Sequence, residues 1–555
     1  MNYINGLHFN NIRGDIYGGL TAAVVALPLA MSMGVASGVG PIAGMYGAIF
    51  VGFFAALLGG TPSQVSGPTG PMTVVMAAIF IQYTGMFPDD PLQGAALAFT
   101  VVVLGGLFQI AFGLLKFGKY IELVPHPVVS GFMSGIGVII ILLQFGPLLG
   151  QPADSSPLQA AQSIPYYLSQ LDINSLSLGL IALAVVYGVP TFLPKVNKLV
   201  PSPLLALVIG TVSYLVFFAA GSTPIIGEIP TGFPDFHLPV IDVSLALTMV
   251  ASGLTLAGLG AIDSLLTSLV ADNVTRSQHK PDRELIGQGI GNTIAGLFGG
   301  LPGAGATMRT VVNVKAGGRT PISGSLHSVI LLIIVLGAGS LASDIPKAVL
   351  AGILIKVGTD IIDWDYLKRM KSAPRAGVLI MFTVLIITVT IDLLLAFGVG
   401  MVIASFLFMQ RITDMQIEQM RPIISPTDEI PLSDVENEIL KNSNNEIMLF
   451  HLSGPMSFTS AKALIRRHSS ALDYNIMLLD LTDVSVIDYT FTKALDDIII
   501  NTLETGRKVF LIGASGKVHS MLQNQNVLKH FEENTMFSQR ILALKHAQEV
   551  IDDKS

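Results

Sequence analysis

The residues Gly299-Gly300-Leu301-Pro302-Gly303-Ala304-Gly305-Ala306-Thr307-Met308-Arg309-Thr310 separate two apolar runs of the chain. The stretch is rich in glycine, so its backbone is bare and can approach a ligand closely. The next apolar run begins after the basic residues Lys315 and Arg319. Irregular backbone at membrane depth is tolerated only where it is buried in protein or lines a watery cavity. We therefore interpret this stretch as one half of a ligand site inside a membrane protein.

The composition is that of a polytopic membrane protein. The 555 residues are 51% hydrophobic and 12% charged, and the mean hydropathy is +0.65. An average soluble domain is about 25% charged. There is no cysteine, which excludes disulfides, thiolate metal sites and cysteine nucleophiles. The formal net charge is -7, with acids gathered in the last third of the chain, and no nucleic-acid partner is expected.

Apolar segments recur along the first 411 residues. A spanning helix needs about 20 mostly apolar residues, and two of the fourteen segments, 68–83 and 307–315, are too short to cross alone. Apart from Lys347, basic residues fall in alternate loops. Three of the opposite loops contain neither Lys nor Arg: 84–92, 149–176 and 221–244. Because basic loops stay in the cytoplasm, we expect fourteen elements in the inner (plasma) membrane, with both termini cytoplasmic.

The chain also repeats itself. The residues 55–62 (Ala-Ala-Leu-Leu-Gly-Gly-Thr-Pro) resemble 295–302, and a short helix start follows each copy, at 67–75 and 306–312. The copies are seven elements apart, and this odd number gives them opposite orientations in the membrane. Short segments interrupted by Gly and Pro in corresponding positions of two halves indicate a transporter's binding site. Chance similarity of Gly-rich membrane sequence is the alternative.

After Arg411 the sequence changes to that of a soluble domain. Residues 412–445 are polar and charged and are predicted to be a linker. Beyond them, three short apolar runs have the pattern of buried strands, and three helical patterns alternate with them. This alternation predicts a small α/β domain over 446–555.

The two short helices predict an anion site. A helix N-terminus presents free N–H groups and a partial positive charge. Two half-helices of opposite orientation can aim these ends at one spot, where backbone amides hold a small anion. Threonine hydroxyls would add donors there, and Arg309 would add positive charge. The candidate anion-binding residues are Thr69, Gly70, Ala306, Thr307, Met308 and Arg309.

Asp263 is the candidate for cation coupling. It is a lone acid in an apolar run, and an ionisable residue inside a membrane is functional by default. Thr267 lies one turn later on the same face, so the two could offer oxygens to Na⁺ or take up a proton. Gly303 and Gly305 complete the candidate set. The alternative is that Asp263 only neutralises Arg309 in a buried structural ion pair.

At these residues the chain resembles the SulP family of anion transporters. The resemblance extends almost from end to end, and as a set the motifs are specific. The matching runs are Asn11–Ile16, Gly67–Val75, Gly131–Gly137, Asp263–Ser268, Glu284–Gly289, Ala316–Thr320 and Lys356–Trp364.

The resemblance implies an inverted repeat of seven plus seven elements in a transmembrane domain over 1–411, with elements 1–7 at about 16–220 and 8–14 at about 245–411. A core domain of elements one to four and eight to eleven would move against a gate domain. The tail resembles a STAS domain, and a homodimer is implied. In bicarbonate carriers of the family, the acid at Asp263 implies Na⁺ coupling, whereas elsewhere it goes with H⁺. Arg309 matches an arginine common in the wider family, which keeps sulfate open.

We expect a secondary active transporter of a small inorganic anion, working by alternating access. Na⁺-coupled bicarbonate uptake is the first hypothesis, and a sulfate transporter coupled to H⁺ or Na⁺ is the alternative. An uncoupled anion channel and a receptor signalling through the STAS tail are further alternatives. An enzyme is not expected, since the sequence offers no metal cluster, nucleophile–base pair or phosphate loop. The expected partners are the anion, the bilayer and a second copy, with no cofactor beyond Na⁺ as coupling ion.

Overall fold

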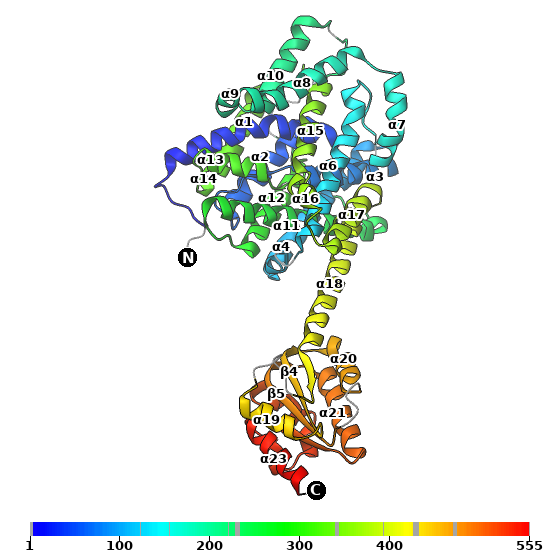
Figure 1. The fold of residues 1–555 in the computed structure, drawn as a ribbon. Coiled ribbons are helices and arrows are strands. Elements are labelled where there is room, and N and C mark those ends of the chain that lie inside the picture. Colours follow the sequence, from blue (N-terminus) through cyan, green and yellow to red (C-terminus); the bar gives the residue numbers. More distant parts are fainter. Residues whose placement is uncertain are drawn as a thin grey trace. The chain divides into compact units, whose positions relative to one another are not determined.

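The computed structural model describes residues 4–121, 124–154, 156–219, 221–227, 234–338, 343–391, 393–425, 432–469 and 474–553. The chain divides into two compact units, Met1–Val402 and Ile403–Ser555. The first unit is helical, and the second contains a β-sheet (Figure 1). The division between the units and the boundary predicted at residue 411 both fall within one helix, α18 (Leu393–Glu418).

Each of the fourteen predicted apolar segments has a helix at its position. The first seven are α1 (Ile12–Ala36), α2 (Pro41–Leu58), α3 (Gly70–Met86), α4 (Pro91–Leu114), α6 (His126–Leu148), α8 (Ile173–Phe192) and α10 (Ser202–Phe217). The second seven are α11 (Ala246–Thr275), α12 (Pro281–Leu297), α13 (Thr307–Lys315), α14 (Pro321–Ala338), α15 (Lys347–Ile361), α17 (Arg375–Thr390) and α18. Among the described residues, seven helices are long and apolar enough to cross a membrane, and four shorter helices are also apolar.

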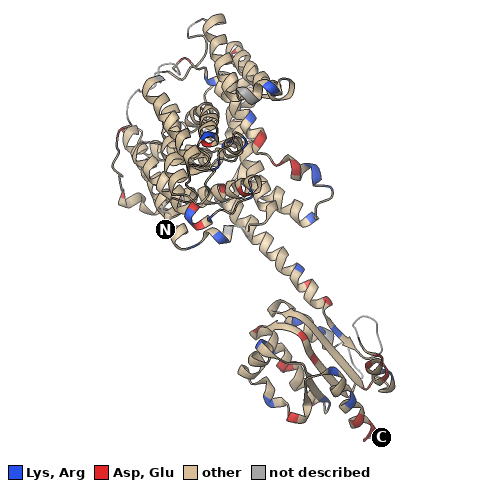
Figure 2. Ribbon diagram, turned by 90° about the vertical axis from the view of Figure 1, so that its left-hand side faces the viewer, with Lys and Arg blue, Asp and Glu red and all other residues tan. Residues whose placement is uncertain are grey.

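Short helices lie in the connections of this unit. They are α5 (Gly118–Ile121), α7 (Pro157–Ser169), α9 (Pro194–Leu199) and α16 (Trp364–Arg369). Figure 2 shows few Lys, Arg, Asp or Glu residues along the long helices. The few acids and bases inside this unit therefore need a specific explanation.

The long helices pack in two groups that mix the two halves of the chain. In one group α12 packs against α4 and α2, and α14 packs against α1 and α2. In the other group α15 packs against α6 and α8, and α17 packs against α6. Glycines bring the backbones close, as between α4 and α12, where a Cβ on Gly289 would lie 2.6 Å from the Gly106 carbonyl oxygen. These groups have the membership expected for a core and a gate.

The described part of the second unit holds a five-stranded sheet in the order β3-β4-β5-β6-β7. The strands are β3 (Met420–Ile423), β4 (Ile447–Met456), β5 (Ile476–Ile487), β6 (Lys508–Ile512) and β7 (Met536–Phe537). The helices are α19 (Asp434–Asn442), α20 (Phe458–Ser469), α21 (Tyr489–Glu504), α22 (Gly516–Asn524) and α23 (Arg540–Asp552). The strands β4 to β7 are parallel, and the apolar runs of β4, β5 and β6 are buried on both faces.

The segment predicted as a linker, 412–445, is partly structured. It holds the end of α18, helix α19 and strand β3, which pairs antiparallel with β4. Pro422 suits β3 to the edge of the sheet, because proline cannot donate to a second neighbour. A four-residue strand without alternating hydrophobicity gives little sequence signal. Residues 426–431 of the predicted linker lie outside the described residues.

A buried carboxylate, Asp480, connects β4, β5 and α23. Its Oδ2 accepts from Arg540 Nε at 2.8 Å and forms a hydrogen bond of 2.9 Å with His451 Nδ1. Its Oδ1 accepts from Thr482 Oγ1 at 2.6 Å and from the Thr482 N–H at 3.1 Å. Burial alone would raise the pKa of Asp480. The hydrogen bonds from His451 and Thr482 and the charge of Arg540 outweigh burial and lower the pKa to about 2.

We expect Asp480→Asn to lower the free energy of unfolding of this unit by about 2 kcal/mol at pH 7, since one pKa unit corresponds to about 1.4 kcal/mol. The folded pKa of about 2 lies below the unfolded value of 3.8, so this stability is present above the unfolded pKa. It is lost as pH falls through the folded pKa. Hydrogen exchange of β4–β6 peptides should separate variant from wild type at pH 7 and bring them together near pH 2.

The neighbouring Asp483 provides the control. It lies 3.6 Å from His451 Nε2, but its side chain is 57% exposed. Asp483→Asn should change the stability by less than about 0.5 kcal/mol, as surface substitutions do. A difference between Asp480→Asn and wild type that stays constant with pH would contradict the role of the ionised carboxylate.

Candidate functional site

The two short helices begin at a crossing of two extended segments. Strand β1 (Ser66–Gly67) precedes α3, and β2 (Ala304–Gly305) precedes α13. The strands pair antiparallel, with Ser66 opposite Gly305 and Gly67 opposite Ala304. Because they run in opposite directions, α3 and α13 leave the crossing on opposite sides, with both N-termini beside it. This is the arrangement that the repeated motif predicts.

Glycine is required where the two segments cross. A Cβ on Gly303 would lie 2.5 Å from the carbonyl carbon of Gly67, and Gly67 has a φ of +149°, which favours glycine. The Gly303 N–H donates to Asn292 Oδ1 at 2.7 Å, and its oxygen accepts from Asn292 Nδ2 at 2.9 Å. Gly303, predicted as part of a cation site, therefore has a structural explanation in the close crossing.

Both helix starts present backbone donors at the crossing. Thr69 is the N-cap of α3 and Ala306 is the N-cap of α13, and neither side chain caps its helix. The first-turn N–H groups of a helix have no intrahelical acceptor. In α3 these belong to Gly70 and Met72, since Pro71 has none, and in α13 the first is that of Thr307. A small anion at this place would satisfy them.

The candidate cation residues contact these helix starts directly. Thr69 Oγ1 donates to Asp263 Oδ2 at 2.6 Å. Thr267 Oγ1 donates to the Gly305 oxygen at 2.9 Å and lies 2.7 Å from Thr307 Oγ1. Asp263, Thr69 and Thr267 are buried. The two predicted sites are therefore one cluster, and the Thr69 hydroxyl, predicted as an anion donor, is directed at Asp263 instead.

Arg309 does not pair with Asp263 in the described structure. The guanidinium is 2% exposed and donates through Nη2 to the Pro68 oxygen at 2.5 Å. Its Nη1 is buried without a hydrogen-bond partner. Among the described residues, Arg309 and Asp263 thus have different hydrogen-bond partners and form no direct ion pair. A buried guanidinium with a free N–H group beside two helix N-termini increases the positive potential there.

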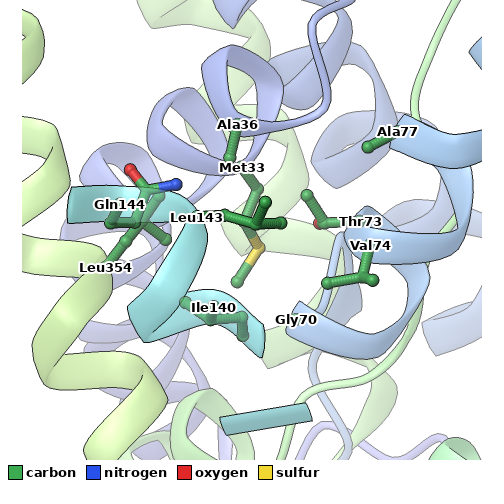
Figure 3. Close-up of a pocket in the computed structure, with 10 residues that line it drawn as sticks. All are labelled: Met33, Ala36, Gly70, Thr73, Val74, Ala77, Ile140, Leu143, Gln144 and Leu354. Atoms are coloured by element: carbon green, nitrogen blue, oxygen red, sulfur yellow. The ribbon is translucent and has the colours of Figure 1, made fainter. Parts of the chain in front are cut away.

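The cluster is accessible on the α13 side. Thr307 is exposed and Met308 is 50% exposed, while Arg309, next along the helix, is buried. On the α3 side, Gly70 borders a small open cavity between α1, α3, α6 and α15. Figure 3 shows the side chains of Met33 and Leu143 facing those of Thr73 and Val74 across this cavity. Its lining is almost wholly apolar.

Sequence reasoning missed a polar stripe on α12. Glu284, Gln288 and Asn292 are spaced by four residues, so they share one helix face. Asn292 holds Gly303, and Gln288 Nε2 donates to Ser66 Oγ at 2.6 Å. The i, i+4, i+8 spacing of polar residues in an apolar helix could have predicted a polar face buried against other elements.

The oxygens of the cluster suit an alkali cation or a proton. They come from the Asp263 carboxylate, the Thr267 and Thr307 hydroxyls and the Gly305 carbonyl. Within the described ranges, no group of three or more His, Cys, Asp or Glu residues gathers to hold a metal ion. Carbonyls of unwound segments at helix ends are the ligands that transporters use for Na⁺.

Known transporters are similar to this chain over nearly its whole length. The bicarbonate transporter BicA of Picosynechococcus sp. is 44% identical over 550 residues, covering 99% of this chain and 96% of the relative. BicA of Synechocystis sp. is 45% identical over 548 residues, with the same coverage. A putative sulfate transporter of Bacillus subtilis, YvdB, is 28% identical over 548 residues, covering 96% of this chain and 97% of the relative.

Solved structures agree with the fold. The transmembrane domain of a cyanobacterium bicarbonate transporter, BicA, matches with a TM-score of 0.66 and 49% identity, covering 71% of this chain and 100% of that chain. The structure of SLC26A9 matches with a TM-score of 0.83 and 19% identity, covering 99% of this chain and 92% of that chain. The second likeness concerns the fold alone. Together they confirm the predicted helical membrane fold with a C-terminal α/β domain.

Family models match both parts of the sequence. Residues 12–384 match the Sulfate permease family, and residues 438–540 match the STAS domain. The resemblance to SulP anion transporters is thereby confirmed, and the members it matches are transporters rather than enzymes. The chain belongs to the Sulfate permease family, as a multi-pass membrane anion transporter with a C-terminal STAS domain.

Proposed function

We propose that the protein carries bicarbonate across the plasma membrane together with Na⁺ by alternating access. The observation that carries the proposal is the meeting of the α3 and α13 N-termini at the β1–β2 crossing, with Asp263 bonded to Thr69 beside them. The names of the relatives at 44% and 45% identity support bicarbonate as the anion. The binding roles of all ten candidate residues are part of this proposal.

The hydrogen bonds of the cluster suggest how the two ions are coupled. The Thr69 hydroxyl hydrogen is directed at Asp263. A Na⁺ ion bound to the Asp263 carboxylate would offset its negative charge and weaken the hydrogen bond from Thr69. The Thr69 hydroxyl could then turn its hydrogen toward an anion at the helix starts. Thr307, in contact with Thr267, would respond in the same way, so each ion favours binding of the other.

Alternating access follows from the two groups of helices. α3, α11 and α13 carry the site, and α6 and α15 face α1 and α3 across the cavity that borders Gly70. Movement of the helices that carry the site against α6 and α15 would open this cavity toward Gly70. The same movement would close the side where Met308 is exposed. The apolar lining of the cavity would exclude water and ions while the cavity stays narrow.

Sulfate is the second candidate because of Arg309. One additional positive charge favours a divalent anion, since the interaction of two unit charges at 4 Å is about 4 kcal/mol at an effective dielectric constant of 20. A putative sulfate transporter is also among the relatives. We expect Arg309→Met, which removes the charge but keeps much of the volume, to weaken sulfate binding relative to bicarbonate about tenfold, equal to about 1.4 kcal/mol.

The measurement is the concentration of sulfate that halves bicarbonate uptake, divided by the half-saturating bicarbonate concentration. Arg309→Lys is the matched control, because it keeps the charge and loses the bond to the Pro68 oxygen. It should leave the ratio close to the wild-type value. An equal ratio in wild type and Arg309→Met would exclude Arg309 from anion selection.

Uptake into proteoliposomes tests the function. Labelled bicarbonate and labelled sulfate are supplied in parallel, with an inward Na⁺ gradient, with a pH gradient, or with neither. The proposal predicts saturable bicarbonate uptake that requires Na⁺. Sulfate uptake driven by the pH gradient would establish the alternative, and large uncoupled anion currents would indicate a channel.

The protein is also proposed to be a homodimer in the plasma membrane with both termini in the cytoplasm. The distribution of basic loops supports this orientation. Of the seven described helices that could span the membrane, α18 is the least buried. Only 17% of its apolar stretch is buried, compared with 67% for α1. Val402 and Phe406, one turn apart on α18, are exposed, which leaves that face available to lipid or a second copy.

A further inference from the structure

Glu284 is a second acid buried inside the membrane unit, and the mechanism above does not use it. It lies in the first turn of α12 and is 1% exposed. Its Oε2 accepts from the backbone N–H groups of Gly60 at 2.8 Å and Thr61 at 2.9 Å. Its Oε1 accepts from Gln64 Nε2 at 2.9 Å and Gln288 Nε2 at 2.8 Å. Four donors directed at two oxygens suit an ionised carboxylate, which can only accept.

Two of these four partners reach the β1–β2 crossing, one on each strand. Gln288 Nε2 donates to Ser66 Oγ in β1 as well as to Glu284. Gln64 lies against Gly305 in β2, where a Cβ would be 2.3 Å from Gln64 Nε2. One carboxylate thus fixes the orientation of two amide groups, and each amide fixes one strand.

The same group also reaches the helix that carries Asp263. Gln64 Oε1 accepts from Ser268 Oγ on α11 at 3.0 Å. One turn earlier on α11, Ser264 Oγ accepts from the Gly305 N–H at 3.1 Å. β2 is therefore bonded to α11 through Ser264 and through Thr267, which donates to the Gly305 oxygen. Gln64, which lies against β2, is bonded to Ser268 of the same helix.

We propose that Glu284 is the positioning residue of the coupling site: through Gln64 and Gln288 it holds β1 and β2 in the register that aligns the oxygens of Gly305, Thr267 and Asp263. It touches neither the cation nor the anion. Where it concerns the cation, this inference rests on the function proposed above. The crossing itself is a feature of the fold and can be measured without any ion.

Glu284→Gln is the first test. A glutamine replaces one of the two accepting oxygens by an N–H₂ group, which cannot accept. Either the two side-chain amides or the backbone N–H groups of Gly60 and Thr61 then lose their acceptor. Removing such a supporting group around a metal site typically weakens affinity about 10- to 100-fold. We expect a half-saturating Na⁺ concentration for uptake about tenfold higher than in wild type. Gln64→Leu removes the bonds to Glu284 and Ser268 but keeps the other three donors to Glu284. It should act in the same direction and serves if Glu284→Gln does not fold.

Asp15→Asn is the matched control. Asp15 is also a fully buried acid, and it accepts from the Arg319 N–H at 2.8 Å, the Thr320 N–H at 2.9 Å and Thr320 Oγ1 at 2.8 Å. These bonds connect α1 to the start of α14, and none reaches β1 or β2. Its loss should lower the melting temperature but leave the half-saturating Na⁺ concentration unchanged.

Two readouts on the full-length protein decide the inference. The first is Na⁺-dependent bicarbonate uptake, and the second is hydrogen exchange of peptides covering 62–68 and 301–307 without Na⁺. Both Glu284→Gln and Gln64→Leu should speed exchange there about tenfold, as expected if the local opening costs about 1.4 kcal/mol less. If either readout is unchanged in both variants, the inference is overturned. If wild-type uptake does not require Na⁺, the proposed coupling ion is wrong, and the exchange measurement alone decides the role of Glu284.

Discussion

Asp263→Asn should reduce Na⁺-driven bicarbonate uptake by about a hundredfold or more, because removing one partner of a buried charge interaction costs about 3–5 kcal/mol. The carboxylate supplies the negative charge of the proposed cation site. The fold should persist, since the asparagine oxygen can still accept from Thr69 Oγ1, which now donates to Asp263 at 2.6 Å. The measurement is the initial rate of uptake with and without an inward Na⁺ gradient, beside the melting temperature of the purified protein.

Asp15→Asn is again the control for a lost buried acid, and it should keep uptake dependent on Na⁺. Wild-type Na⁺ dependence in Asp263→Asn would remove Asp263 from the mechanism. Loss of folded protein in both variants would show only that buried acids are needed for folding, so the melting temperatures must be compared first.

Gly303→Ala should also abolish most of the uptake, for a steric reason. The new Cβ would lie 2.5 Å from the carbonyl carbon of Gly67 and 2.6 Å from its oxygen, whereas carbon atoms in contact lie about 3.5–4.0 Å apart. The obstacle is backbone and cannot rotate away, so the two segments must separate by about 1 Å. A misplacement of that size in a binding constellation can cost about a hundredfold in rate.

Gly258→Ala is the matched control for this substitution. Gly258 lies in α11, the helix that carries Asp263, and a Cβ there would meet nothing within 4 Å. It should fold and transport like wild type, since alanine favours a helix over glycine by about 1 kcal/mol. If Gly303→Ala transports as well as Gly258→Ala, the close crossing is not needed for transport.

The membrane fold was predictable from the sequence because its causes are local. A spanning helix must be apolar over its whole length, and basic residues mark the loops on one side. The crossing was predictable for another reason: Gly59-Gly60-Thr61-Pro62 and Gly299-Gly300-Leu301-Pro302 are related copies. Two copies in opposite orientations bring two interrupted helices to one place.

The contacts inside the site were not predictable, because they depend on side-chain directions that spacing does not give. An Asp263–Arg309 ion pair was one alternative that the sequence left open, whereas in the structure Asp263 accepts from Thr69, and Arg309 donates to the Pro68 oxygen. Glu284 stood within a motif, but nothing nearby in sequence indicates that its partners are Gly60 and Thr61, more than 220 residues earlier. Strand β3 was missed because it is stabilised by its neighbour β4.

Protection of an introduced cysteine by substrate tests the anion site most directly. The chain has no cysteine of its own, so Met308→Cys places a single thiol at the start of α13, where Met308 is 50% exposed. The thiol is labelled with a charged reagent at increasing bicarbonate concentrations, with Lys315→Cys at the other end of α13 as the control. We predict that bicarbonate slows labelling of Met308→Cys alone, with half-maximal protection at the concentration that half-saturates uptake. Labelling of Met308→Cys that does not change at any concentration of the transported anion would contradict an anion site between the two helix starts.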